Sequence, residues 1–307
     1  MNKRSKLSSF YLKYCRTLYI FLISLVAAAL LFSCSFSGYC SSEDNQKSVS
    51  KPKPESRFVC ILQGADYEML STYQFDMAIV DPDDSGLSKN DLKNLHSQGK
   101  KMFAYLSIGE AENYRDYWGE DWKTGYPDFV EKENAEWKGN FKVKYWDKKW
   151  QKIVFTMLAK ITDTGYDGVY LDVVDAYKYF ENSGFTNARQ QMEDFVISIS
   201  EYSKNINANF LIIPQNAEEL TESKDYFAAI DGAGRESLWY LYDTLQDEED
   251  FADSLAYLDS IKNSGRLVFV ISYCSKEENI KDFKKLARTH GFISFVGTKE
   301  LDHILNP

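Results

Sequence analysis

Histidine, proline and cysteine are scarce in this 307-residue sequence, which contains three His, six Pro and five Cys. His96, His290 and His303 stand far apart, and none is placed at metal-ligand spacing from another. This disfavours a histidine-based metal site and a Ser-His-Asp triad, because both require imidazole side chains at set positions. The cysteines show no framework of paired spacings. We therefore expect no metal ion and no organic cofactor.

Basic residues are also in deficit. The chain holds 36 Lys and Arg against 46 Asp and Glu, a formal net charge of -10. Five basic residues and no acidic one lie before residue 34, so the rest of the chain keeps 31 of the 36 basic residues and all the acidic ones. A body this acidic repels phosphate backbones and anionic surfaces. We therefore expect no nucleic-acid partner.

The N-terminus has the features of a bacterial export signal with a lipid anchor. A basic segment containing Lys3 and Arg16 precedes an uncharged apolar stretch at 18–32. This stretch is shorter than the roughly 20 residues that a membrane span needs. It ends in LFSC (31–34), which resembles a lipobox in which Cys34 is acylated. An uncleaved anchor helix is the alternative. Both interpretations place the body outside the cytoplasmic membrane, in the cell envelope.

A flexible tether is expected between the signal and the body. We assign residues 1–33 to the signal peptide, 34–56 to the tether and 57–307 to a single domain. Residues 35–56 are rich in Ser, Lys and acidic side chains and show no apolar period. Cys40 lies in the tether, whereas Cys60 and Cys274 lie in apolar segments, where buried free thiols are expected rather than a disulfide.

The body alternates apolar strand patterns with helical patterns eight times, which predicts a (β/α)8 TIM barrel. Hydrophobic residues make up 44% of the chain, enough for a sizeable core. No GxGxxG motif follows the first strand, and the turn Gly232-Ala233-Gly234 is expected to be a loop. The predicted strands are 58–62, 77–81, 102–107, 168–172, 210–213, about 226–231, 267–271 and 292–296, and the main helices are 67–73, 88–97, 149–162, 188–203, 248–262 and 277–289.

Polar residues gather where the predicted strands end, and in a barrel this is where the chemistry lies. Asp172 ends the apolar strand Val169-Tyr170-Leu171, where a lone carboxylate is rarely structural. Glu236 follows Arg235 beyond the sixth strand and is either functional or a partner of that arginine. Helix caps or turn residues are the alternative for several other acids, which are Asp83, Asp84, Asp175 and Asp231.

Two carboxylates at a barrel mouth with nearby aromatic side chains favour glycoside chemistry. One acid protonates the leaving oxygen, and the other acts as nucleophile or as base on a water. Aromatic faces suit sugar rings, and amides suit their hydroxyls. A long insert at 112–148 supplies the aromatics, of which about half are expected to form only a hydrophobic cluster: Tyr114, Tyr117, Trp118, Trp122, Tyr126, Trp137, Tyr145 and Trp146.

Four segments resemble glycoside hydrolase family 114: YLSIGEAENYRDYW (105–118), GYDGVYLDVVDAY (165–177), IIPQNAEEL (212–220) and IDGAGRESLWY (230–240). The resemblance covers about residues 57–305. It implies hydrolysis of α-1,4-linked galactosamine or N-acetylgalactosamine polymers, with Asp172 as nucleophile or base and Glu236 as general acid. The residues expected to bind substrate, with Asp175 added from its place after the fourth strand, are Asp81, Tyr105, Glu110, Asp175, Gln215, Asn216 and Tyr273.

Two other classes of function stay open. The same cleft would serve a non-catalytic, surface glycan-binding lipoprotein, and a scaffold or adhesin would use the barrel only as a core. A buried pair of acids favours the enzyme, because a pure binder has little reason to bury both carboxylates. The expected partners are a polysaccharide or oligosaccharide and a membrane held through the N-terminal lipid, and the protein is expected to be a monomer.

Overall fold

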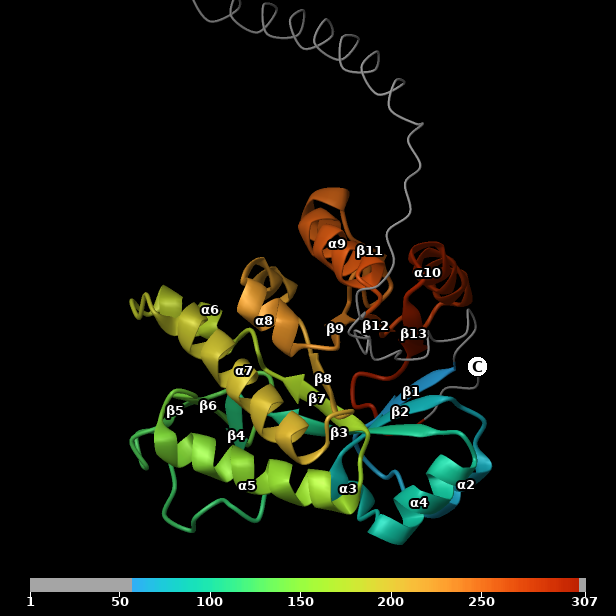
Figure 1. The fold of residues 1–307 in the computed structure, drawn as a ribbon. Helices are drawn as coiled ribbons and strands as arrows, with labels where there is room; N and C mark the ends of the chain where they lie inside the picture. The colour runs from blue at the N-terminus through green and yellow to red at the C-terminus, as the bar shows by residue number, and fades with distance from the viewer. Residues whose placement is uncertain (1–56, 304–307) are drawn as a thin grey trace, which may run out of the picture. The chain divides into compact units, whose positions relative to one another are not determined.

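Eight parallel strands run through the centre of the structure, a computed structural model that describes residues 57–303 (Figure 1). The predicted signal peptide and tether, with Cys34 and Cys40, lie outside the described residues. The strands are β1 (Phe58–Ile61), β2 (Met77–Val80), β3 (Lys101–Ser107), β7 (Gly168–Asp172), β8 (Leu211–Pro214), β9 (Gly232–Glu236), β12 (Leu267–Ser272) and β13 (Ile293–Val296). Most of their residues are buried, as expected when helices cover a parallel sheet.

The strands follow one another in chain order around a barrel. One hydrogen-bonded sheet has the order β1-β2-β3-β7-β8, and a second has the order β13-β12-β9. A parallel bridge between Gln215 and Gly234 joins the two sheets at β8 and β9. At the other seam, the Phe58 and Phe295 rings of β1 and β13 lie 5.9 Å apart between centroids. The predicted eight-stranded α/β architecture is therefore present.

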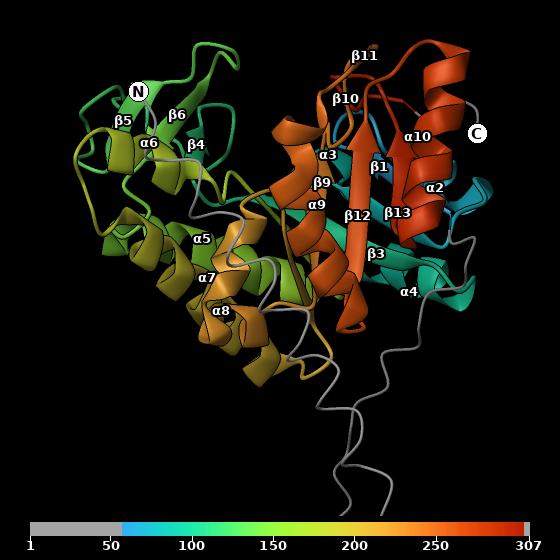
Figure 2. The same cartoon turned by 90° about the horizontal axis from the view of Figure 1, so that it is seen from above.

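Helices surround these strands, and Figure 2 shows α9 and α10 beside β12 and β13. In α5 the buried residues Trp150, Val154, Leu158 and Ile161 recur at helical spacing, so one face packs inward. The helical elements are α2 (Tyr67–Thr72), α3 (Pro82–Ser85), α4 (Lys89–Ser97), α5 (Lys148–Thr164), α6 (Ala176–Asn182), α7 (Ala188–Ile206), the 3-10 helix η1 (Glu218–Glu222), α8 (Lys224–Ala229), α9 (Glu248–Asn263) and α10 (Glu277–His290).

Local signals in the sequence set several helix ends. Ser88 and Asp91 form a capping box at the start of α4, each accepting a hydrogen bond from the backbone N–H of the other. Helix α10 stops at Gly291, whose φ of 68° places it in the left-handed region that glycine adopts without strain. These ends depend on neighbouring residues only, which is why the sequence predicts them.

The sixth strand lies further along the chain than the sequence predicts. Residues 226–231 fall mostly in helix α8, and the strand is β9, which contains the glycine turn expected to be a loop. A Cβ added at Gly232 would lie 2.5 Å from the Leu267 carbonyl oxygen, and one at Gly234 would lie 2.1 Å from the Tyr170 hydroxyl oxygen. Close neighbours thus require glycine in this strand, although glycine lowers strand propensity.

The shifted position of the sixth strand gives Asp231 and Glu236 different places from those that the sequence predicts. Asp231 precedes β9 instead of ending a strand, and its carboxylate accepts a hydrogen bond from the Ile212 backbone N–H (3.0 Å) and pairs with Lys204 (2.8 Å). It therefore has a structural role. Glu236 is the last residue of its strand, in the same position that Asp172 holds in β7.

The insert after β3 forms a small antiparallel sheet of β4 (Glu110–Glu112), β6 (Asn140–Val143) and β5 (Val130–Glu133). Five of its eight Tyr and Trp residues pack against other aromatic rings, so the hydrophobic-cluster interpretation holds for them. Tyr114, Tyr126 and Trp137 are exposed instead. A two-stranded hairpin, β10 (Tyr240–Leu241) with β11 (Thr244–Leu245), follows β9.

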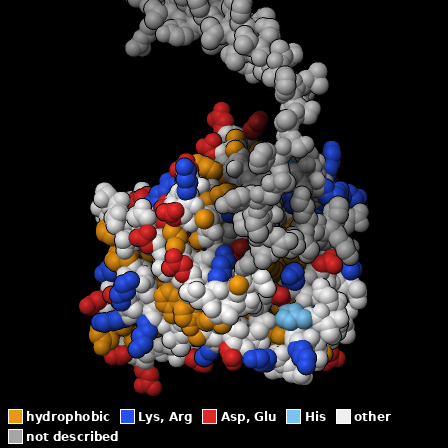
Figure 3. Space-filling model, in the orientation of Figure 1, with side chains coloured by type: hydrophobic (Ala, Val, Ile, Leu, Met, Phe, Trp, Pro, Cys, Tyr) orange, Lys and Arg blue, Asp and Glu red, His pale blue; other side chains and the backbone are white. Residues whose placement is uncertain are grey.

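The face of the described part seen in Figure 3 carries intermixed acidic and basic side chains around areas of hydrophobic ones. Within residues 57–303, no helix combines the length and the hydropathy needed to cross a membrane. Cys60 and Cys274 are buried free thiols, as the sequence predicts.

Candidate active site

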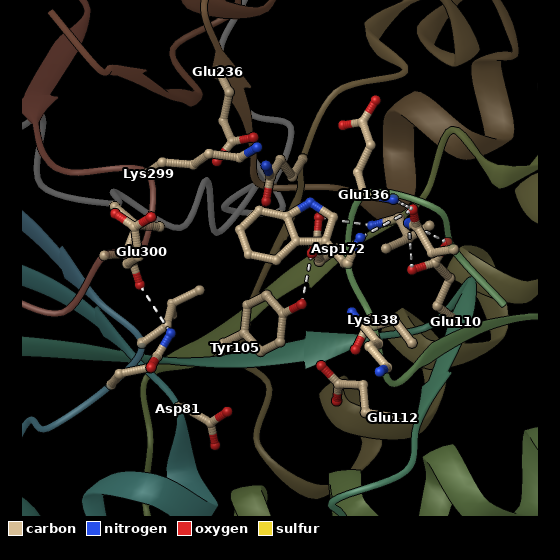
Figure 4. A pocket seen from close by; sticks show the side chains of 18 of the residues that line it. Asp81, Tyr105, Glu110, Glu112, Glu136, Lys138, Asp172, Glu236, Lys299 and Glu300 are labelled. Carbon is tan, nitrogen blue, oxygen red and sulfur yellow. Dashed lines mark hydrogen bonds between the residues drawn. The ribbon is translucent and has the colours of Figure 1, made fainter.

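A cavity of about 1330 Å³ opens at the carboxyl ends of the barrel strands. Asp172 and Glu236 point into it from β7 and β9, which flank β8 (Figure 4). The cavity brings together all nine residues that the sequence predicts to be catalytic or substrate-binding: Asp81, Tyr105, Glu110, Asp172, Asp175, Gln215, Asn216, Glu236 and Tyr273. The nine side chains therefore share one cavity, and their catalytic or binding roles stay predictions.

Asp172 is held by two hydrogen bonds. The Tyr105 hydroxyl donates to Oδ2 (2.6 Å), and the Val173 backbone N–H donates to Oδ1 (2.8 Å). Burial, followed by the nearby charge of Glu236, raises the pKa of Asp172 to about 7, and the two hydrogen bonds oppose this increase. The carboxyl group therefore titrates near neutral pH, where proton transfer is useful for catalysis.

Glu236 has a similar environment. The Tyr273 hydroxyl donates a hydrogen bond to its Oε1. Burial raises the pKa of Glu236, while hydrogen bonds from Tyr273 and Gln215 lower it. Because both acids are buried near one another, the pair keeps one proton to higher pH than two exposed carboxyl groups would.

Arg235 does not form an ion pair with Glu236, although the sequence allows such a pair. Its Nη1 lies 3.2 Å from Oε1 of Glu218, which is itself almost fully buried. Alternate residues of a strand point to opposite faces, so Arg235 projects toward η1 when Glu236 projects into the barrel. The interpretation of Glu236 as only the ion-pair partner of Arg235 is therefore wrong.

Left-handed backbone follows three successive strand ends at the cavity. Val173 after β7, Asn216 after β8 and Ser237 after β9 have φ values of 58°, 58° and 51°. This region is unfavourable for non-glycine residues, and for β-branched valine above all. Gly109 makes the first turn possible, because a Cβ there would lie 2.1 Å from the Val173 carbonyl oxygen. The turns fix the directions in which Asp172 and Glu236 leave their strands.

Asp81 and Glu110 line the cavity but already have cationic partners. Arg115 donates to both carboxylate oxygens of Asp81 (2.8 and 2.6 Å) and to Glu112 (2.7 Å). Lys142 lies 3.1 Å from Glu110. These pairs neutralise part of the negative charge at the strand ends, so both acids would contact substrate as members of ion pairs.

Asp175 differs from these acids. It precedes α6, but its side chain forms no helix-capping hydrogen bond, so the helix-cap alternative is wrong for this residue. Its charge raises the pKa of both Asp172 and Glu236, which places it close to the two acids. Asp83 and Asp84 also line the cavity, where Asp83 lies 3.3 Å from Arg115 and Asp84 accepts a hydrogen bond from the Gly64 N–H (2.6 Å). For both residues, the turn-residue interpretation and a functional role stay predictions.

Several lining residues were not predicted. Arg115 and Glu112 lie within segment 105–118, which resembles the glycoside hydrolase family. The sequence could therefore have predicted that they lie beside the cavity. Lys299 follows the last strand without any motif, and its ammonium group lies 5.1 Å from the centre of the Trp137 ring. Trp137 comes from the insert after β3, so this insert and the segment after the last strand meet at the cavity rim.

No group of three or more His, Cys, Asp or Glu residues within 57–303 is arranged to hold a metal ion. The histidines pair with acids outside the cavity: His96 lies 2.9 Å from Asp167 and His290 lies 2.8 Å from Asp259. The arrangement at the strand ends is therefore a set of carboxyl, phenol and amide groups, which can transfer protons and bind hydroxyls.

Sequence comparison identifies relatives along most of the chain. The profile of the glycoside-hydrolase family GH114 matches residues 41–306. An uncharacterized protein of Methanocaldococcus jannaschii is 34% identical over 283 residues, which cover 85% of this chain and 82% of that protein. An uncharacterized protein of Deinococcus radiodurans is 37% identical over 238 residues, 76% of each chain.

Solved structures share the fold. Aspergillus fumigatus Ega3, in complex with galactosamine, superposes with a TM-score of 0.67 at 16% identity, covering 88% of this chain and 99% of Ega3. The glycoside hydrolase domain of PelA from Pseudomonas aeruginosa gives a TM-score of 0.62 at 19% identity, covering 81% of this chain and 96% of that domain. At these identities the likeness concerns the fold alone.

Proposed function

The chain belongs to glycoside-hydrolase family GH114, and from this membership we propose that it hydrolyses α-1,4 bonds in a polysaccharide of galactosamine or N-acetylgalactosamine. The observation that carries the proposal is the shared cavity of Asp172 and Glu236. Both acids end buried strands, both have a tyrosine donor, and both have a raised pKa. Perturbed acids in a cleft are typical of catalytic groups.

In the proposed mechanism, Glu236 is the general acid. Its proton passes to the glycosidic oxygen as the bond from that oxygen to the anomeric carbon breaks. Asp172 either removes a proton from a water that attacks the anomeric carbon, or attacks that carbon itself; in the second case a water deprotonated by the Glu236 carboxylate then displaces Asp172 and releases the sugar. Tyr105 and Tyr273 hold the two carboxyl groups in position and supply hydrogen bonds to their charged forms.

The charge of the cavity supports an amino sugar as substrate. Twelve Asp and Glu residues line it against five Lys and Arg residues. An acidic cleft raises the local concentration of cations, and galactosamine carries an ammonium group when it is not acetylated. Exposed aromatic rings at Tyr114, Trp137 and Tyr242 line the same cavity and offer faces for sugar rings. The complex of Ega3 with galactosamine gives further support.

The test is hydrolysis of galactosamine and N-acetylgalactosamine polymers by the purified protein, with products identified by mass spectrometry. Asp172→Asn and Glu236→Gln should each lower kcat by about 10²- to 10⁴-fold, the usual contribution of acid–base catalysis. Asp194→Asn on the exposed face of α7 is the matched control and should leave kcat unchanged. Tight binding of the polymer without any product over long incubation would instead favour the glycan-binding alternative.

We also propose that the protein acts outside the cytoplasmic membrane as a lipoprotein. The support is in the sequence: a basic segment, a short apolar stretch and Cys34 preceded by the small residue Ser33. A polysaccharide substrate fits this location, because a chain too large to cross a membrane is met outside the cell.

A further inference from the structure

Glu218 is a buried carboxylate beside β9, the strand that ends at Glu236. It is the first residue of η1, and its side chain is 1% exposed. Neither of its carboxylate oxygens forms a hydrogen bond with a described residue, and the Arg235 guanidinium supplies its counter-charge at 3.2 Å. Neither Glu218 nor Arg235 lines the cavity. A buried charge is unfavourable unless it is paired, so this ion pair calls for a role that needs no contact with substrate.

The turn that carries Glu218 is strained and is fixed to the end of β9. Asn216 and Ala217 have φ values of 58° and 53°, so two successive non-glycine residues have left-handed backbone. The Asn216 backbone N–H donates to a carbonyl oxygen of β9 (2.7 Å), and the Glu236 backbone N–H donates to Asn216 Oδ1 (3.4 Å). Strain of this kind persists only where neighbouring contacts hold it. These contacts fix the guanidinium of Arg235 and the carboxylate of Glu218 beside the backbone of Glu236.

The charge of Arg235 is unfavourable for a general acid next to it in the chain. Burial raises the pKa of Glu236, and the positive charge of Arg235 opposes this increase. A general acid must hold its proton until the leaving oxygen takes it, whereas a nearby cation favours the ionised carboxylate. The negative charge of Glu218, paired with the same guanidinium, offsets that effect.

The other groups around Glu236 are the same whether or not Glu218 is present. The phenols and the thiol among them have raised pKa values, so they are neutral. A change at Glu218 therefore acts on Glu236 through the balance of charge between Glu218 and Arg235. The titratable and charged groups that share the cavity with Glu236 closest to the strand ends are Asp172 and Tyr170 on β7, Asp175 before α6, Cys60 on β1, Tyr273 after β12 and Lys299 after β13.

We propose that Glu218 is a positioning residue for the general acid, which offsets the charge of Arg235 so that Glu236 keeps its proton until the glycosidic oxygen takes it. This inference rests on the proposed glycoside hydrolase function, in which Glu236 donates that proton. It gives two residues outside the cavity an effect on the pH range of the reaction, without contact with the sugar.

The test follows the high-pH limb of the kcat/KM profile on the polymer, where loss of the Glu236 proton ends activity. Glu218→Gln leaves the Arg235 charge without its partner and should move this limb to lower pH by about 0.5 to 1 unit. That is less than the roughly 1 to 3 units of a carboxyl group paired directly with arginine. Adding Arg235→Met removes the charge as well and should return the limb to its wild-type pH. A purely structural role predicts no return, because the double variant lacks the whole ion pair.

Glu193→Gln in the full-length protein is the matched control. Glu193 is also a buried glutamate paired with an arginine, since Arg189 lies 3.1 Å from it, but it does not line the cavity. Both Glu218→Gln and Glu193→Gln should lower the Tm, because a buried ion pair that loses one partner is destabilising. Only Glu218→Gln should move the limb.

A direct titration separates this inference from the proposed function. The carbon-13 NMR signal of the Glu236 carboxyl group, identified by its loss in Glu236→Gln, should titrate at lower pH in Glu218→Gln and return in the double variant. A limb and a titration that do not move in Glu218→Gln, or that move equally in Glu193→Gln, would overturn the inference and leave the proposed function intact.

Arg235→Met alone provides the test if Glu218→Gln does not fold. The charge of Glu218 then acts without its partner, so the high-pH limb and the Glu236 titration should move to higher pH. A limb that stays in place or moves to lower pH would overturn the inference. A wild-type protein that cleaves no amino-sugar polymer would remove the proposed function and, with it, the catalytic role of the ion pair.

Discussion

Single residues at the strand ends carry the chemistry, and the two acids are expected to respond differently to substitution. Glu236→Ala should retain activity on an aryl glycoside whose leaving group needs no protonation, because the general acid is then dispensable. Asp172→Ala should lose activity on the same substrate. Rates on activated and unactivated substrates check this, and the opposite pattern would exchange the two roles.

The ionised Asp172 carboxylate should also lower the free energy of unfolding at neutral pH. Its folded-state pKa of about 7 lies above its ordinary value of 3.8, so ionisation disfavours the folded state as the pH rises between these values. Asp172→Asn should therefore raise the free energy of unfolding by up to about 4 kcal/mol at pH 8. The gain should vanish near pH 3.5, where the native carboxyl is neutral as well. Urea titrations at both pH values measure it, and an equal gain at both would contradict the raised pKa.

Asp175 should tune both acids through its charge. Because that charge raises the pKa of Asp172 and Glu236, Asp175→Asn should move the pH profile of kcat/KM to lower pH. A control variant, Asp194→Asn, should leave the profile in place. An unshifted profile in Asp175→Asn would contradict the electrostatic effect of this carboxylate on the two acids.

At the scale of elements, the sequence predicts those strands and helices whose signals are local. Apolar runs predict β3 and β12, and the Ser88–Asp91 pair predicts the start of α4. Strand β9 is missed because Gly232 and Gly234 have low strand propensity and are required by contacts with Leu267 and Tyr170, far away in the chain. Lys299 is missed for the same reason, since only the closed barrel brings it to Trp137.

The packing of β9 against β7 can be tested by filling the space at Gly234. The three nearest atoms to an added Cβ all belong to the Tyr170 side chain, at 2.1 to 2.5 Å. Gly234→Ala should therefore cost about 1–3 kcal/mol of unfolding free energy, as overpacked cores do. In a Tyr170→Ala background the same change should cost much less. Equal costs in the two backgrounds, measured by chemical denaturation, would place the strain elsewhere.

At the scale of the whole molecule, the prediction concerns the attachment of the protein to a membrane through Cys34. Cys34→Ala should abolish incorporation of a labelled fatty acid and move the protein from the membrane fraction to the soluble fraction, because one cysteine thiol carries the acyl chain. Cys40→Ala is the matched control, since it changes a cysteine six residues away and should keep both label and location. Membrane retention of an unlabelled wild-type protein and of Cys34→Ala would favour the uncleaved anchor helix, and labelling that follows Cys40 would move the acylation site to that cysteine.

Trp137 has a practical consequence for finding the natural ligand. It is 42% exposed at the cavity rim beside Lys299, whereas Trp118, Trp122, Trp146, Trp150 and Trp239 pack against other rings. A sugar ring that stacks there would displace water and the ammonium group from one indole out of six. A change in intrinsic tryptophan fluorescence can therefore detect the binding of unlabelled glycans. The Trp137→Phe variant is the control, and its emission should not change when the glycan is added.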